Sequence, residues 1–73
     1  MTLNELKINQ KAVILKIHCI KRARDRLNDI GVFEGDVITL INKAPFNDPL
    51  LIKVKNSYIA IRVSLASQIE VLI

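Results

Sequence analysis

The sequence predicts a small, mostly β fold, in which about five short strands curl into a barrel and one helix lies near residues 21–30. The 73 residues are 51% hydrophobic but only 4% aromatic, so the core must be aliphatic. The aliphatic residues fall in short β-branched runs separated by turn residues, which is typical of strands. A flat sheet of such strands would leave one aliphatic face in water, whereas a barrel encloses that face.

The first predicted strand covers residues 11–18, which are aliphatic and β-branched without helical spacing. The helix follows at residues 21–30, because Ala23, Leu27 and Ile30 recur at helical spacing and share one face. We expect these three side chains to close one end of the barrel.

The helix has a strong stop signal. Gly31 stands where a helix needs a left-handed residue, and Val32 follows as the hydrophobic contact of a Schellman-type turn. Lys21 and Asp25 lie four residues apart on this helix, so we expect an ion pair between them.

The second half of the chain predicts four more strands. Leu50, Ile52 and Val54 alternate with other residues and should share one buried face. Asn56 and Ser57 are predicted to form a two-residue hairpin connection, with Asn56 at positive φ. The predicted segments are strands at 37–42, 50–55, 58–62 and 68–73, a two-proline loop at 44–49, and a single helical turn at 64–67. An SH3-like barrel fits this order best, with an OB-type barrel as the alternative.

The length and composition also limit which classes of function are possible. We expect one domain over residues 1–73. No apolar run approaches the roughly twenty residues of a membrane-spanning helix, and no secretory segment is recognisable. Cys19 is the only cysteine, so we expect a protein of the reducing cytoplasm. An enzyme with a deep pocket is not expected at this size.

Positive charge is concentrated in the first third of the chain. The net charge is +5 over residues 1–26 and −1 over residues 27–73. The favoured interpretation is a solvated face with ion pairs, and the alternatives are a footprint for nucleic acid or an anionic membrane. The first 32 residues contain no aromatic residue on which bases could stack, so we expect no nucleic acid partner. The densest basic residues are Lys21, Arg22, Arg24 and Arg26.

Candidate chemistry is sparse. His18 and Cys19 are adjacent, so in an extended segment their side chains point to opposite faces and cannot chelate one ion together. Cys19 is therefore interpreted as a small buried residue. Gly31 and Gly35 are the only glycines and serve turns, so there is no phosphate-binding glycine pattern. We predict no catalytic, cofactor-binding or metal-binding residues.

Two aromatic residues are hard to place in the core. Phe33 follows the helix stop, and Phe46 lies in the two-proline loop. The favoured interpretation is that they cap an end of the barrel. The alternative is that one of them anchors a partner, as aromatic residues do at the centre of interfaces.

Several motifs occur in a characteristic order. The segment 26–32 combines an arginine-leucine helix with an aspartate, an apolar residue and a glycine, and Gly35 opens the next strand. The loop follows with its two prolines, and Ile59, Ile61, Arg62 and Ala66 end the series. Taken together, these motifs resemble the ferrous-iron-transport protein A (FeoA) family, the small SH3-like cytosolic component of the bacterial Feo iron(II) uptake system.

The chain departs from the family pattern at several turns. It has Ile8 and Asn9 where the family usually has proline and glycine, and Glu34 where proline is common. Glycine is common at the positions of Asn47 and Asn56, and asparagine tolerates left-handed geometry better than other non-glycine residues.

The resemblance implies a regulatory protein without catalysis or a cofactor, which contacts the membrane iron transporter and its cytosolic GTPase region (FeoB-type). It would meet the inner membrane only through that partner. Arg22, Arg24 and Arg26 would steer the contact, and Phe33 or Phe46 would anchor it.

Other interpretations stay open. Arg26 fits an ion pair with Asp29 equally well. The alternative functions are a basic barrel that binds nucleic acid, an SH3-like domain of a metal-dependent repressor, and direct iron(II) sensing through His18.

Overall fold

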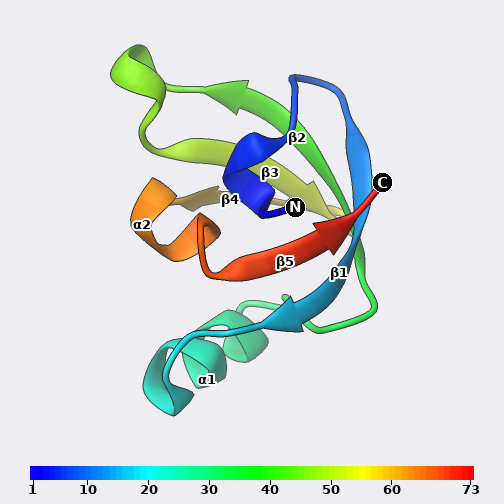
Figure 1. Ribbon diagram of the computed structural model, residues 1–73, viewed down its shortest axis with the longest axis vertical. Helices are drawn as coiled ribbons and strands as arrows, with labels where there is room; N and C mark the ends of the chain where they lie inside the picture. The colour runs from blue at the N-terminus through cyan, green and yellow to red at the C-terminus, as the bar shows by residue number, and fades with distance from the viewer.

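The computed structural model describes residues 1–73 and shows one antiparallel sheet that curls around a core (Figure 1). The strand order in the sheet is β4-β3-β2-β1-β5. The strands are β1 (Lys11–Ile17), β2 (Val37–Lys43), β3 (Leu50–Val54), β4 (Ser57–Ile61) and β5 (Ile69–Leu72). The helices are α1 (Lys21–Asp29) and α2 (Val63–Ala66), with 3-10 turns at Leu3–Glu5 and Pro45–Asn47. The predicted mostly β fold with one main helix is confirmed.

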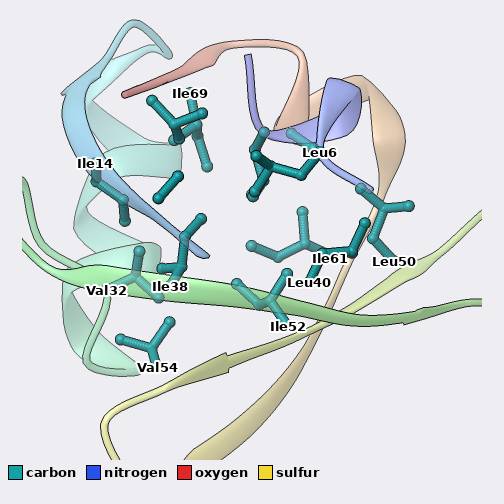
Figure 2. Close-up of a cluster of buried hydrophobic side chains, with 14 of the residues drawn as sticks. Leu6, Ile14, Val32, Ile38, Leu40, Leu50, Ile52, Val54, Ile61 and Ile69 are labelled. Atoms are coloured by element: carbon teal, nitrogen blue, oxygen red, sulfur yellow. The ribbon is translucent and has the colours of Figure 1, made fainter. Parts of the chain in front are cut away.

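The core is entirely apolar. Seventeen residues are buried, and none of them is polar or charged. Figure 2 shows 14 of these side chains, which converge from the strands, the N-terminal segment and Val32 after the helix stop. Leu50, Ile52 and Val54 share the buried face of β3, as their alternation predicts.

Two irregularities in the pairing accompany the curl of the sheet. The register shifts in β1 between Ile14 and Lys16, and in β2 between Leu40 and Asn42. Because an extra residue bends a strand and increases its twist, these bulges fold the sheet over its own aliphatic face. The two long strands can then contribute to both halves of the barrel.

Helix α1 ends in the predicted Schellman turn. Gly31 has φ +96°, and its N–H donates to the carbonyl of Asn28 at 3.0 Å. The N–H of Val32 donates to the carbonyl of Leu27 at 2.8 Å, and the Val32 side chain is fully buried. These two hydrogen bonds satisfy carbonyls that would otherwise lack partners.

The prediction that Ile30 helps to close the barrel is wrong. Leu27 is buried and Ala23 packs against the core, but Ile30 is 51% exposed. The chain leaves the helix at Ile30, which is its C-cap, so this side chain points away from the core. Cys19 and Val32, which flank the helix, are buried in the core instead.

The hairpin between β3 and β4 lies one residue earlier than predicted. Ser57 pairs with Val54, so the two turn residues are Lys55 and Asn56, and Lys55 rather than Asn56 has positive φ. This register keeps Ile61 on the buried face, and a shift by one residue would expose it. Core packing therefore sets the turn and overrides the preference of asparagine for positive φ.

The N-terminal segment lies along β5. The N–H of Val71 donates to the carbonyl of Met1 at 2.8 Å, and Thr2 forms a β-bridge with Glu70. Neither helix has the length and apolarity that crossing a bilayer requires.

Gly31→Ala should lower the free energy of unfolding by about 1 kcal/mol, because alanine is strained at positive φ. A methyl group at this position meets no atom within 4 Å, so the loss comes from the backbone alone. Urea denaturation measures the change. Gly31→Asn is the matched control and should lose less, since asparagine tolerates this region better. An alanine variant as stable as the wild type would contradict the backbone argument.

Candidate functional site

A groove of about 620 Å³ separates α1 from the end of β4 and α2. Its apolar residues come from one face of α1 and from the β4–α2 segment, and charged side chains stand among them. The lining residues are Ala23, Arg26, Leu27, Asp29, Ile30, Ala60, Ile61, Arg62, Ser64 and Leu65. This groove is the most extensive apolar hollow on the molecule and is the candidate binding site.

The groove follows from the way that α1 is attached. The helix leaves the sheet after β1 and returns to it at β2, whereas β4 lies at the far edge of the same sheet. The Ile30 side chain, left outside the core by the Schellman turn, faces this gap. Ile61 and Leu65 supply apolar surface on the other side.

The start of α2 is fixed by a side chain from the β2–β3 loop. Asp48 Oδ1 accepts a hydrogen bond of 3.1 Å from the N–H of Val63, the first residue of α2. Asp48 Oδ2 also lies 3.8 Å from Arg62 Nη1, but the Arg62 side chain is 70% exposed. Such an exposed ion pair is weak, so the Arg62 guanidinium remains available to a ligand in the groove.

The basic residues of α1 do not form one surface. Arg26 lines the groove, and Arg22 lies one turn before it on the same side of the helix. Arg24 is two residues from both and points to another side. Lys21 forms the predicted ion pair with Asp25, at 2.9 Å.

The alternative ion pair for Arg26 does not form. No salt bridge joins Arg26 to Asp29, although both line the groove. Arg26 therefore keeps a free guanidinium beside the apolar surface of Ile30.

The two phenylalanines lie outside the groove. Phe33 is 43% exposed, and the ammonium of Lys55 lies 5.1 Å from its ring centre in a cation–π contact. Phe46 is fully exposed and has φ +65°. Its loop, between β2 and β3, lies at the top of Figure 1, whereas α1 lies at the bottom. The prediction that these rings cap the barrel is wrong for Phe46, because its left-handed backbone conformation leaves the side chain fully exposed in the loop.

His18 and Cys19 point in different directions, as predicted. Cys19 is buried in the core, whereas His18 is exposed and its Nε2 lies 2.9 Å from Glu70 Oε1. This hydrogen bond lowers the pKa of the Glu70 carboxyl. No group of three or more histidine, cysteine, aspartate or glutamate side chains is arranged to hold a metal ion.

Sequence reasoning missed most of the groove. Arg62, Leu65 and Ala60 come from the β4–α2 segment. The sequence pattern of that segment predicts a strand and a helical turn, but it does not indicate which other segment lies opposite them. The one usable signal was Ile30, an apolar residue placed directly before a helix stop, where the chain leaves the helix axis.

A family model described as the FeoA domain matches residues 1–72. The chain is similar to a Fe(2+) transport protein A of Campylobacter jejuni, with 32% identity over 71 residues that cover 97% of this chain and 96% of that protein. It is 31% identical over 71 residues to a fusion of Fe(2+) transport protein A with the Fe(2+) transporter FeoB in Porphyromonas gingivalis. That match covers 97% of this chain and 8% of the fusion protein.

Solved structures share the fold. The iron(II) transport protein A of Clostridium thermocellum superposes with a TM-score of 0.94 at 29% identity, covering 100% of this chain and 45% of that one. This chain thus spans less than half of that protein. The zinc complex of FeoA from Stenotrophomonas maltophilia, described as a prokaryotic SH3 domain protein, gives 0.81 at 31% identity, covering 97% and 88%. The predicted SH3-like barrel is confirmed.

His18→Ala should raise the pKa of Glu70 toward its ordinary value, because the hydrogen bond from His18 is the main cause of its lowering. A lowered folded-state pKa stabilises the fold above the ordinary glutamate pKa, and this stability is lost as pH falls through the lowered value. The variant should therefore lose less stability on acidification. NMR titration of the side-chain carboxyl carbons measures the pKa of Glu70 in the wild type and in the variant.

Glu5 is the internal control for this titration. Its pKa is lowered by a hydrogen bond from the backbone N–H of Thr2 and should not change in the variant. A Glu70 pKa that stays where it was would contradict the pairing with His18.

Proposed function

This chain belongs to the FeoA family of ferrous iron transport accessories, and from that premise we propose that it acts by binding the cytosolic GTPase region of a FeoB-type membrane transporter. The protein would regulate iron(II) uptake through this contact and carry out no catalysis. The fusion in Porphyromonas gingivalis supports the choice of partner, because joining two chains keeps them at high effective concentration.

The observation that carries this proposal is the exposed apolar groove beside α1. A surface of this kind favours a protein partner, since burial of its side chains gives affinity and its few charged groups give orientation. Ile30 is half exposed at its rim, and Arg26 and Arg62 flank it.

In this proposal the arginines of α1 attract the partner, whereas the apolar groove binds it. Arg22 and Arg24 are exposed and outside the groove, so they would raise the rate of association through long-range attraction. Arg26 would do the same and also contact the partner directly. Phe46 is the better candidate for an aromatic anchor, because Lys55 already covers the ring of Phe33.

We place the whole of residues 1–73 in one FeoA-type domain that works on the cytoplasmic side, where it meets the inner membrane only through the transporter. The Asp48 carboxylate and the hairpin register would then hold the groove in shape.

Ile30→Asn should weaken binding to the purified GTPase region of the transporter by at least about tenfold, because a buried apolar contact would be replaced by an unpaired amide. Isothermal titration calorimetry measures the dissociation constant. Ile20→Asn is the matched control: Ile20 is 73% exposed at the other end of α1 and does not line the groove. Asparagine is favoured at the N-cap position that Ile20 occupies, so the control variant should keep its helix. Equal affinities for the two variants would exclude the groove as the contact.

The triple variant Arg22→Glu, Arg24→Glu and Phe46→Ala should no longer co-purify with the full-length transporter. Three exposed side chains change, so the fold should stay intact, which circular dichroism checks. The double arginine variant alone should bind about tenfold more slowly at low salt, with the difference disappearing at high salt. Co-purification of the triple variant at wild-type levels would exclude both the steering and the anchoring roles.

A further inference from the structure

One edge of the sheet is covered by another segment of the chain, and the other edge is not. The edge strands are β5 and β4. The N-terminal segment covers β5, through the hydrogen bond between Val71 and Met1 and the bridge between Glu70 and Thr2. No segment pairs with the outer side of β4. An uncovered edge is a template for another strand, and folds usually avoid leaving one.

Alternation along β4 identifies the free backbone groups. Ser57 and Val54 close the two-residue hairpin and therefore exchange both hydrogen bonds. The next pair, Tyr58 with Lys53, is then not hydrogen-bonded, and neither is the pair of Ala60 with Leu51. The N–H and C=O groups of Tyr58 and Ala60 point away from β3, and no turn, loop or cap hydrogen bond uses them.

This open edge runs between two hollows. The apolar groove lies on the inner side, next to Ile61. A second hollow of about 350 Å³ lies on the side of Leu51 and the two-proline loop. Ala60 lines both hollows and is itself exposed, so the small side chain leaves room on either side of the strand.

The two hollows differ in chemistry. The inner groove is mainly apolar, and Arg26, Arg62 and Asp29 also line it. On the outer side, Lys43 lines the second hollow, and the ammonium of Lys53 lies over the ring of Tyr58 at 5.5 Å. Successive side chains of an added strand would point alternately into the two sides.

We propose that β4 binds an extended segment of the partner protein as a sixth strand, and that this segment alternates apolar and acidic residues. The apolar side chains enter the groove beside Ile30, and the acidic ones face Lys43 and Lys53. Backbone pairing with Tyr58 and Ala60 gives register, while the pockets select the side chains. That the segment belongs to the transporter rests on the proposed function; the open edge and its preferred chemistry do not.

Amide exchange of the wild-type protein tests the pairing, by NMR of the free chain and of its complex with the transporter's GTPase region. The Ala60 and Tyr58 amides should exchange rapidly in the free protein and at least about tenfold more slowly in the complex. The Ile59 amide, which faces β3, should be protected in both states and serves as the internal control.

The outcomes separate this inference from the proposed function. A complex that forms while the Ala60 and Tyr58 amides stay unprotected overturns the added strand alone. Failure to form any complex overturns the proposed partner. A free protein that is dimeric, with both amides already protected, shows a second copy on this edge and overturns the proposal.

A synthetic peptide tests the edge without the transporter. The probe is an eight-residue peptide of alternating leucine and glutamate with blocked ends, and a peptide with the leucines and glutamates in separate blocks is its control. Only the alternating peptide should protect Ala60 and Tyr58. Equal effects of both peptides, or no effect of either, would contradict the preferred chemistry.

Ala60→Pro removes the outward N–H while leaving the hydrogen bonds to β3 in place, and proline is tolerated on an edge strand when its nitrogen faces solvent. It should weaken binding of the alternating peptide by about tenfold, because an acceptor on the peptide loses its donor. Ala60→Ser keeps the N–H and should lose much less affinity for this peptide than the proline variant does. If the proline variant does not fold, amide exchange of the wild type still decides the question.

Discussion

The requirement to enclose an aliphatic core with a single short sheet governs the rest of this structure. Every one of the seventeen buried residues is apolar, so stability comes from burial and packing rather than from buried polar networks. One sheet can bury its own face only by bending over itself, and the two bulges in β1 and β2 accompany that bend. The hairpin register and the position of the helix stop then follow from keeping Ile61 and Val32 inside.

The same requirement explains why the barrel remains open. The strand order ends at β4 on one side and β5 on the other, and these two strands do not pair. Helix α2 crosses between them, held by the Asp48 carboxylate. Helix α1 connects β1 to β2, and the groove lies between this helix and the end of β4. The groove and the free edge are therefore two consequences of one incomplete closure.

Local rules made the elements predictable, and distance along the chain made the site unpredictable. The Schellman turn depends on a glycine and a valine in sequence, and the burial of β3 depends on simple alternation. The groove depends on the spacing between Ile30 and Ile61, which no local pattern encodes. The prediction that Phe46 caps the barrel is wrong for a related reason. An aromatic residue in a loop usually packs over the core, but here the backbone conformation of Phe46 leaves its side chain in water. The sequence places Arg24 in the same basic cluster as Arg22, although helical geometry points their side chains apart.

The free energies expected for ion pairs and for apolar burial indicate which groups supply affinity. An exposed ion pair contributes up to about 1 kcal/mol, and salt screens it. Full burial of an aliphatic side chain contributes about 1.5–3 kcal/mol, and Ile30 and Leu65 offer part of that gain from the two sides of the groove. Affinity should therefore come from the apolar side of β4, whereas the arginines of α1 govern how fast a partner arrives. Because backbone pairing requires one register, the free edge of β4 would add selectivity to an affinity that the groove already supplies.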